Sequence, residues 1–255
     1  MSNKHTYNSK TAVDTYRAAN DLLGPEKTII RLFDDRWQDW RLLDIGIGTG
    51  RTTRYFAPLV EEYVGFDYAE AMVEACKEAF PNLGEHVAIQ LGDARSMPEF
   101  ETGYFDFVFF SFNGLDSISH EDRVRALKEM KRVGRKGGFM FFSSHNLQYI
   151  PNLYKIRHNY NLRYFAYQCY RYCMLLYHNG LPKKYKNLDY AILKDGPQHF
   201  NLNNYYAKPA AMVAQLKDLG FKNIRVFPSK SIGEIDLTDL DKVDQHGWLH
   251  YLCEI

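Results

Sequence analysis

Residues 41–51, RLLDIGIGTGR, join a short apolar run to three glycines at alternate positions, Gly46, Gly48 and Gly50. The apolar run predicts a buried parallel strand, and the residues after the glycines predict the start of a helix. Glycine is needed where the backbone takes positive φ, or where a ligand approaches the chain without meeting a Cβ. The GxGxG spacing, with Asp44 before it, differs from the GxGxxG typical of nicotinamide sites. The stretch predicts either a ligand-binding turn or a turn that only packs a strand on a helix.

Three further predicted strands end in polar residues, which favours the ligand-binding interpretation. The strand over 62–66 is followed by Asp67, the strand over 87–92 by Asp93, and the strand over 104–110 by Ser111. Helices are expected between these strands, near 51–58, 69–80 and 120–133. This alternation predicts an α/β fold with a parallel sheet covered on both faces. The carboxyl ends of such strands are where open α/β sheets bind ligands.

In order and spacing, these segments resemble the class I S-adenosylmethionine-dependent methyltransferases, in particular those that act on small molecules. The matching segments are LLDIGIGTG (42–50), VGFDYAEAMVEACKEAF (64–80), LGDARSMP (91–98), FDFVFFSFNGLDSI (105–118), LKEMKRVGRKGGFMFFSS (127–144) and YYAKPAAMVAQLKDLGFKNIRVF (205–227). The resemblance implies a Rossmann-like, seven-stranded, mostly parallel sheet with helices on both faces. It also implies a last strand that inserts antiparallel, and a helical insertion after the fifth strand.

The resemblance implies S-adenosyl-L-methionine as the cofactor and assigns roles to the strand ends. Asp67 would accept hydrogen bonds from the two ribose hydroxyls, and Tyr68 and Met72 would cover the adenine. Asp93 would accept from the adenine amino group, while the backbone of Ala94 addresses the ring. Met72 is equally well explained as helix core.

The glycine loop would hold the methionine part of the cofactor against the backbone of Gly46, Gly48 and Gly50. Asp44 would then lie near the cationic amino group, and Ser111 would line the far wall.

Methyl transfer to an acceptor that must lose a proton needs a base close by. His145, at the end of the fifth strand, is the first candidate catalytic residue, and His199, before the final helix, is the second. The alternative for each is a hydrogen-bonded structural histidine, and an amine acceptor needs no dedicated base. Tyr7 and Tyr16 resemble a substrate-binding amino-terminal cap over the cofactor, although both could simply pack on the sheet.

Residues 147–194 do not fit the strand–helix alternation, so we expect a core of 1–146 and 195–255 with a separate insertion. Residues 147–190 contain ten tyrosines, seven lysines or arginines and one acid. Tyrosines and arginines recur there every three or four positions, at Tyr154, Arg157, Tyr160, Tyr164, Tyr167 and Arg171, which predicts a helix across 154–171. We expect a lid that places Tyr160 and Tyr164 on the acceptor. Membrane binding, RNA binding and plain packing are the alternatives.

The composition limits the possible classes of protein. The chain has 255 residues, a net charge of +1 and 45% hydrophobic residues. The small charge gives no general attraction to DNA, and the four cysteines show no metal-ligand spacing. We therefore expect a cytoplasmic enzyme without a metal, either a monomer or a homodimer. It would methylate nitrogen or oxygen of a small-molecule acceptor. The alternatives are a non-catalytic cofactor-binding protein, a methyltransferase acting on RNA or a membrane-associated lipid or quinone, and a nicotinamide-dependent dehydrogenase.

Overall fold

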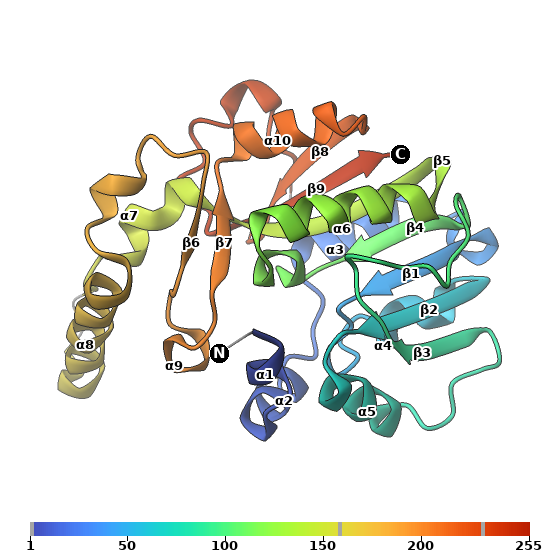
Figure 1. Ribbon diagram of the computed structural model, residues 1–255, viewed down its shortest axis with the longest axis horizontal. Coiled ribbons are helices and arrows are strands. Elements are labelled where there is room, and N and C mark those ends of the chain that lie inside the picture. The colour runs from blue at the N-terminus through green and yellow to red at the C-terminus, as the bar shows by residue number, and fades with distance from the viewer. Residues whose placement is uncertain (1–2, 158–159, 231–232) are drawn as a thin grey trace.

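The computed structural model describes residues 3–157, 160–230 and 233–255, and places a single mixed sheet between helices (Figure 1). The strands are β1 Arg41–Ile45, β2 Glu62–Asp67, β3 Val87–Leu91, β4 Phe105–Phe110, β5 Gly134–Asn146, β6 Tyr190–Leu193, β7 Asn204–Ala207, β8 Lys222–Pro228 and β9 Trp248–Glu254. The α-helices are α1 Asn3–Tyr7, α2 Lys10–Arg17, α3 Gly24–Leu32, α4 Thr53–Phe56, α5 Glu70–Ala79, α6 His120–Val133, α7 Ile150–Leu153, α8 Leu162–Asn179, α9 Pro197–Phe200 and α10 Pro209–Asp218.

Seven of the strands form the sheet that the sequence predicts. The order β3-β2-β1-β4-β5 is parallel throughout, and β9 pairs antiparallel with β5 and with β8. The α/β, Rossmann-like class and the antiparallel last strand are therefore confirmed. The parallel order brings the carboxyl ends of β1 to β4 to one edge of the sheet.

The predicted number of strands was wrong: the sheet of the described residues has nine strands, not seven. The two additional strands, β6 and β7, form an antiparallel hairpin whose second strand pairs with the end of β5 at His145 and Asn146. Strand β4 ends opposite Phe142, so the next residues of the long β5 have a free edge on that side. The hairpin satisfies the backbone groups of that edge, as any exposed strand edge requires.

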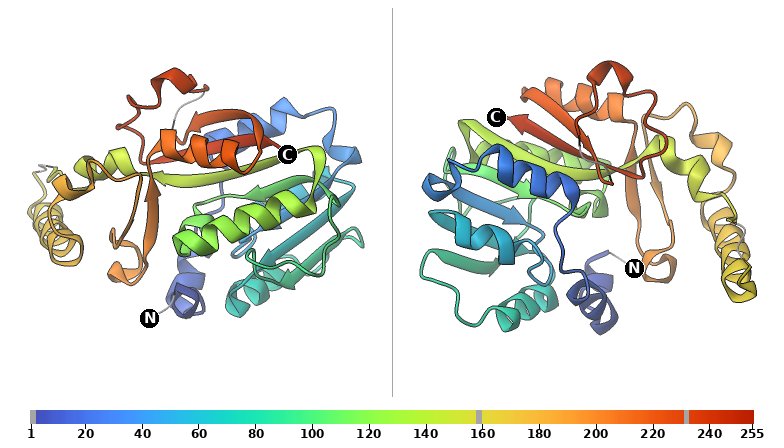
Figure 2. Two further views of the ribbon diagram at one scale, coloured as in Figure 1. Left: turned by 45° about the horizontal axis from the view of Figure 1, so that its top comes forward. Right: turned by 180° about the vertical axis from the view of Figure 1, so that it is seen from behind.

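Helices cover both faces of the sheet (Figure 2). On one face α3 and the following 3-10 helix, Trp37–Asp39, pack with Phe33, Phe107 and Phe141 in a buried, largely aromatic cluster. On the other face α6 and α10 pack through residues such as Met130 and Met212. Burial on both faces explains why the strands are almost continuously apolar.

The amino-terminal segment differs from the single helix expected over 5–23. Two short helices, α1 and α2, are separated at Ser9, whose side chain accepts a hydrogen bond from the Ala12 N–H at 3.2 Å. A serine in this N-cap position starts a new helix. Gly24 and Pro25 begin α3, where proline lacks only an N–H that would have no helical partner.

Residues 147–194 form an arm at the left of Figure 1, with α8 as its outermost helix. The arm and the neighbouring β7 share a separate buried cluster that includes Ile150, Leu175 and Tyr206. A helix was predicted over 154–171, but α8 begins at Leu162, and residues 154–157 and 160–161 are not helical. Residues 158–159 of the predicted helix lie outside the described residues.

Candidate active site

A cavity lies at the carboxyl edge of β1, β2, β3 and β4, where open α/β sheets bind ligands. The sequence-predicted residues that line it are Tyr7, Tyr16, Gly46, Gly48, Asp67, Tyr68, Met72, Asp93, Ala94 and Ser111. Residues that sequence reasoning did not assign also line it, among them Arg95, Phe110, Ser117 and Ile118. The ends of four strands and the amino-terminal helices thus meet at this cavity.

Asp67 ends β2 and is held in the cavity wall by the backbone. Its two carboxylate oxygens accept hydrogen bonds from the N–H groups of Gly48, at 3.0 Å, and Ala69, at 2.9 Å. Burial raises the pKa of Asp67 to about 6, although these backbone hydrogen bonds oppose the shift. A carboxylate can accept about four hydrogen bonds. Two acceptor positions therefore remain for hydroxyl groups in the cavity.

The predicted adenine end of the cavity contains a buried polar atom without a partner. The Tyr68 hydroxyl has no hydrogen-bond partner among the described residues. Met72 is 1% exposed and packs beside it in a small cluster with Ala69. Asp93 is bound by its neighbour Arg95, whose Nη2 donates to Asp93 Oδ2 at 2.6 Å, and this contact holds the pKa of Asp93 below its usual value. An orphaned hydroxyl and an apolar floor fit a nucleoside-sized ligand.

The local geometry of the loop explains why positions 48 and 50 are glycines. Gly48 has φ +55°, and a Cβ there would meet nothing closer than a Tyr16 ring atom at 3.7 Å, so the backbone faces open space. Gly50 does not line the cavity. A Cβ on Gly50 would be 2.3 Å from the Phe80 ring, so this glycine permits close packing on the end of α5.

Asp44 lines a smaller recess that adjoins the cavity at Gly46 and Gly48. Its Oδ2 accepts hydrogen bonds from Thr52 at 2.5 Å and from Tyr63 at 2.6 Å. Complete burial raises the pKa of Asp44 to about 7, against the effect of these hydrogen bonds.

The same recess contains an arginine that the sequence did not single out. Arg51 Nη1 lies 2.6 Å from Glu26 Oε2, and the guanidinium stands 4.8 Å above the Phe112 ring. Burial opposes ionisation of Glu26, but the contact with Arg51 outweighs it and keeps the Glu26 pKa below its usual value. Ser111 donates a short hydrogen bond to the same carboxylate. Arg51 Nη2 lies 2.7 Å from the other Glu26 oxygen, so both terminal nitrogens of the guanidinium are paired with this carboxylate.

The amino-terminal helices close the cavity from the side. Tyr7 and Ser117 share a hydrogen bond of 2.8 Å between their hydroxyls, and Tyr16 packs edge-on against Phe112. Asn3 makes three hydrogen bonds. Its amide Nδ2 donates to the carbonyls of Ser117, at 2.7 Å, and Asn203, at 2.9 Å, and its Oδ1 accepts from the Asn203 N–H at 3.1 Å.

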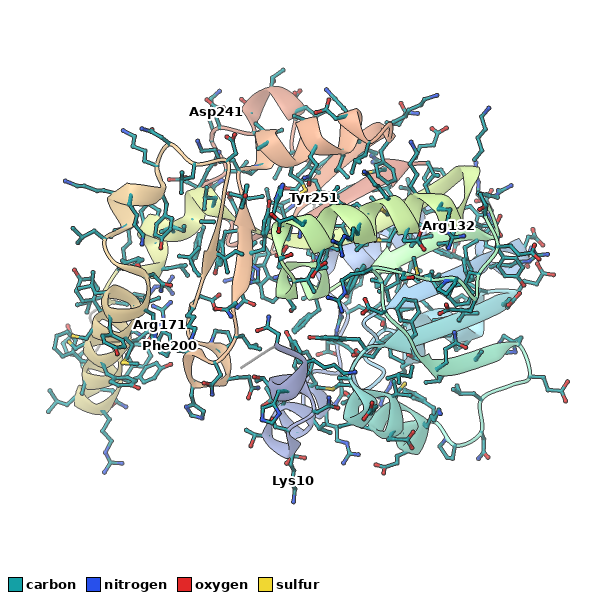
Figure 3. All side chains as sticks on the ribbon, in the orientation of Figure 1. Lys10, Arg132, Arg171, Phe200, Asp241 and Tyr251 are labelled. Carbon is teal, nitrogen blue, oxygen red and sulfur yellow. The ribbon has the colours of Figure 1, made fainter. Side chains whose placement is uncertain are left out.

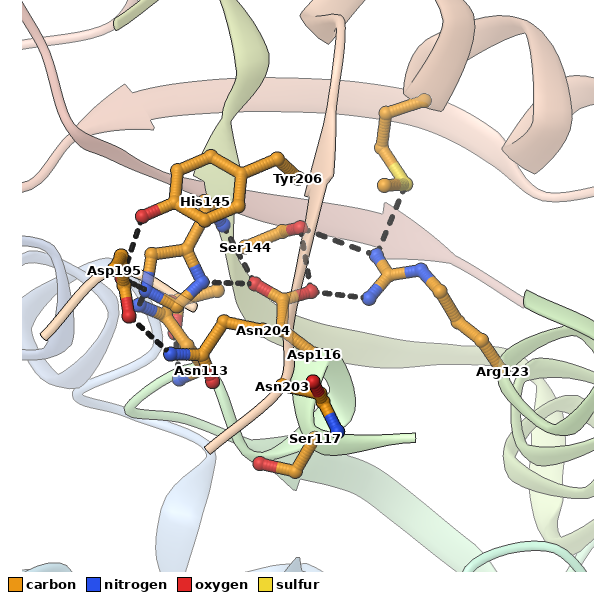
Figure 4. A network of polar contacts seen from close by, with 12 residues as sticks. Asn113, Asp116, Ser117, Arg123, Ser144, His145, Asp195, Asn203, Asn204 and Tyr206 are labelled. Atoms are coloured by element: carbon orange, nitrogen blue, oxygen red, sulfur yellow. Dashed lines mark hydrogen bonds and ion pairs between the residues drawn. The ribbon is translucent and has the colours of Figure 1, made fainter. Parts of the chain in front are cut away.

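His145 does not line the cavity but belongs to a buried polar network behind it (Figure 4). Asp116, in the 3-10 helix Gly114–Ser117, accepts from His145 Nδ1 at 2.8 Å and from the His145 N–H at 2.6 Å. The other Asp116 oxygen accepts from Ser144 at 2.8 Å and forms a short ion pair with the fully buried Arg123. Because Nδ1–H donates a hydrogen bond to Asp116, the neutral ring of His145 has Nε2 as its acceptor nitrogen.

Asn113 connects this network to the cavity wall. Its Nδ2 lies 3.3 Å from His145 Nε2, and its Oδ1 is buried without a hydrogen-bond partner among the described residues. Both neighbours of Asn113 in sequence, Phe112 and Gly114, line the cavity. Asp195 approaches His145 Nε2 to 4.0 Å and accepts a hydrogen bond from Tyr206 at 2.6 Å.

Three other predicted site residues lie away from the cavity. His199 is exposed and has φ +56° in the short α9. Tyr160 is 97% exposed, and Tyr164, on the first turn of α8, is 38% exposed. None of the three lines the cavity.

Comparison with known proteins identifies the class of this site. Residues 42–138 match the family model described as "Methyltransferase domain". The chain is 35% identical over 107 residues to an uncharacterized methyltransferase, YcgJ, of Bacillus subtilis, a match that covers 41% of this chain and 40% of that protein. It is 38% identical over 103 residues to a demethylmenaquinone methyltransferase of Staphylococcus aureus, covering 39% and 41% of the two chains. The chain thus spans about two fifths of the length of the curated relatives it matches.

A solved structure shows the same fold over almost the whole chain. An S-adenosylmethionine-dependent methyltransferase from Clostridium acetobutylicum aligns with a TM-score of 0.63 at 15% identity, covering 98% of this chain and 96% of that one. Residues 42–138 therefore match a methyltransferase domain, in agreement with the resemblance seen in the sequence. The chain as a whole shares the fold of that solved methyltransferase.

Proposed function

We propose that this protein transfers a methyl group from S-adenosyl-L-methionine to a nitrogen or oxygen of a small-molecule acceptor. The observation that carries the proposal is the meeting of Asp67, Tyr68 and the Gly46–Gly48 turn at one cavity, with acceptor positions of Asp67 and the Tyr68 hydroxyl left unused. Asp67 would hold the ribose hydroxyls, and Tyr68 and Met72 would cover the base. The recess with Asp44 and Arg51 would hold the amino-acid end.

When bound, the cofactor supplies an activated methyl group on a sulfonium, and the protein mainly positions the acceptor in line with it. Tyr7, Tyr16 and Phe112 would form aromatic walls around the reacting centre, and aromatic faces favour a neighbouring cation. His145 does not line the cavity, so an acceptor would have to displace the Asn113 amide, 3.3 Å from Nε2, before His145 could take its proton there. Asp116 is the positioning residue, because it accepts the hydrogen bond of Nδ1–H and fixes the ring.

The acceptor class follows from the lining of the cavity. Tyr7, Tyr16, Phe110, Phe112 and Ile118 make most of the wall aromatic or aliphatic. This wall favours a flat, partly apolar acceptor over a strongly charged one. Methylation of a quinone ring carbon is a second candidate, because the Staphylococcus aureus relative is named for demethylmenaquinone.

The free thiol state of all four cysteines supports a cytoplasmic location.

The test is a binding titration followed by a turnover assay. The purified protein is titrated with S-adenosylmethionine and with NAD, and only the former is expected to bind. It is then incubated with S-adenosylmethionine and single acceptors, namely phenols, primary amines and a demethylated quinol, and S-adenosylhomocysteine release is measured. Release that depends on one acceptor supports the enzyme. Tight binding with no release for any acceptor would favour a non-catalytic cofactor-binding protein.

A further inference from the structure

The arm, residues 147–194, carries nearly all of the exposed apolar surface of the described chain. Fifteen large hydrophobic side chains are exposed among the described residues, and twelve of them lie between Ile156 and Ile192. Soluble surfaces rarely gather apolar side chains in one region unless that region binds something.

Helix α8 shows the direction of this surface. Gln168, Leu175 and Asn179 form its buried face, toward the rest of the arm. The opposite face carries a stripe with helical spacing, Leu162, Ala166, Tyr170, Cys173 and Tyr177, and all five residues are exposed. Leu162, Tyr170 and Tyr177 are 82%, 55% and 81% exposed. An exposed apolar stripe of this length indicates that α8 binds a partner on its outer side. Figure 3 shows α8 at the edge of the molecule, with side chains standing out from the rest of the chain.

The charge of the arm indicates which class of partner would bind its apolar surface. The arm contains eight lysines or arginines and one acid, a net charge of +7, whereas the whole chain has +1, so the remainder carries −6. Lys155, Arg163 and Lys186 are exposed. Lys183, Lys186 and Lys208 line a groove whose other walls are largely apolar. Both features match a partner with anionic groups on an apolar body.

We propose that the arm docks on an anionic lipid membrane surface, with the α8 stripe in the headgroup layer and the lysines on lipid phosphates. Tyrosines favour the interface, aliphatic side chains favour the acyl region, and basic residues are attracted by anionic headgroups. A second copy of the chain fits less well, because it would bring two strongly positive arms together. RNA also fits less well, because Leu162, Leu181 and Ile192 cannot stack on bases as aromatic rings do.

This docking is peripheral. No helix in the described part of the chain has both the length and the apolar character needed to cross a bilayer. The inference rests on the arm alone and stands independently of methyl transfer, so its test needs no acceptor.

The experiment is co-sedimentation of the full chain with vesicles of phosphatidylcholine, alone or mixed with an equal amount of phosphatidylglycerol. We expect binding to the mixed vesicles that weakens as salt is raised. Tyr170→Asp/Tyr177→Asp and Lys183→Glu/Lys186→Glu should each lower the partition coefficient at least about tenfold. Leu237→Asp, which changes an exposed leucine outside the arm, is the matched control and should stay within about twofold of the wild type. Circular dichroism checks that each variant is folded.

Three results would overturn the proposal. One is equal or absent binding to the two vesicle types. The second is a wild-type dimer in light scattering that Tyr170→Asp/Tyr177→Asp separates, without vesicle binding. The third is binding to a single-stranded RNA, but not to vesicles, that the lysine variant abolishes.

Discussion

Asp67 and Asp116 are both buried carboxylates at the carboxyl edge of the sheet, yet their surroundings differ. Asp67 accepts two backbone hydrogen bonds, has no cationic partner among its hydrogen bonds and lines the cavity. Asp116 accepts from Arg123, Ser144 and twice from His145, so all of its acceptor positions are used by the protein. Unused hydrogen-bonding capacity, more than burial, therefore distinguishes a side chain that can bind a ligand from one that stabilises the fold.

The largest difference between the two acids should appear in stability. Asp116→Ala leaves the fully buried Arg123 without its carboxylate, and breaking a buried pair in this way costs about 3–5 kcal/mol of unfolding free energy. Urea unfolding measures this loss. Glu234→Ala, which breaks the half-exposed pair with Arg225, should cost no more than about 1 kcal/mol. Equal losses of unfolding free energy in Asp116→Ala and Glu234→Ala would contradict a structural role of Asp116.

The second largest effect is expected in the turnover of variants of His145, the residue that Asp116 positions. Once an acceptor is known, His145→Ala should lower kcat by about 100-fold or more, because the acceptor proton loses its base. Cofactor affinity should be nearly unchanged, since His145 does not line the cavity. His199→Ala, at an exposed histidine, is the matched control and should keep wild-type turnover. Undiminished turnover of His145→Ala would remove the base from the proposed mechanism while leaving the fold intact.

Asp67 should show the opposite profile, a change in binding with little change in stability. Asp67→Ala should weaken S-adenosylmethionine binding at least about tenfold, or about 1.4 kcal/mol, through loss of the two ribose contacts. Isothermal titration calorimetry gives the dissociation constant. Glu74→Ala on α5, whose side chain is 70% exposed, should bind as the wild type does. An unchanged affinity in Asp67→Ala would identify Asp67 as an acid that only fixes the glycine loop.

The smallest effect is in the pH dependence of binding. Burial raises the Asp67 pKa to about 6, so the ionised form that accepts two hydroxyls is lost below that pH. Binding should weaken about fourfold between pH 7 and pH 5.5. The sign for folding is opposite: a raised acid pKa stabilises the unliganded protein at low pH, and this stability is lost as pH rises through about 6. Asp67→Asn should reduce the slope of both profiles, and the slope that remains should come from Asp44, whose pKa burial raises to about 7. An unaltered slope would contradict the assignment.

Sequence reasoning reached the cofactor side of the site because strand ends have a fixed meaning in a parallel sheet. Once β1 to β4 were recognised, Asp67, Asp93 and Ser111 had to lie at one edge. The β6–β7 hairpin was missed because its place depends on where β4 stops along β5. That is a property of the assembled sheet and leaves no periodic signal.

The polar network was beyond reach for a related reason. Asp116, Arg123 and His145 come from a 3-10 helix, a long helix and a strand, and their partnership exists only after packing. The spacing of aromatic residues in the arm predicted a helix correctly in kind. It could not tell which side of that helix would be covered, because tyrosine suits both a core and an interface.

Asn3 links two segments that are otherwise far apart in the chain, the 3-10 helix at Ser117 and the hairpin loop at Asn203. A molecule that enters by displacing α1 must break all three contacts of this one amide together. Entry by this route would therefore free the 3-10 helix at Ser117, which lines the cavity, and the β6–β7 hairpin at the same time. Through these three hydrogen bonds, a displacement of the first residues of the chain would also loosen the hairpin that pairs with β5 at His145.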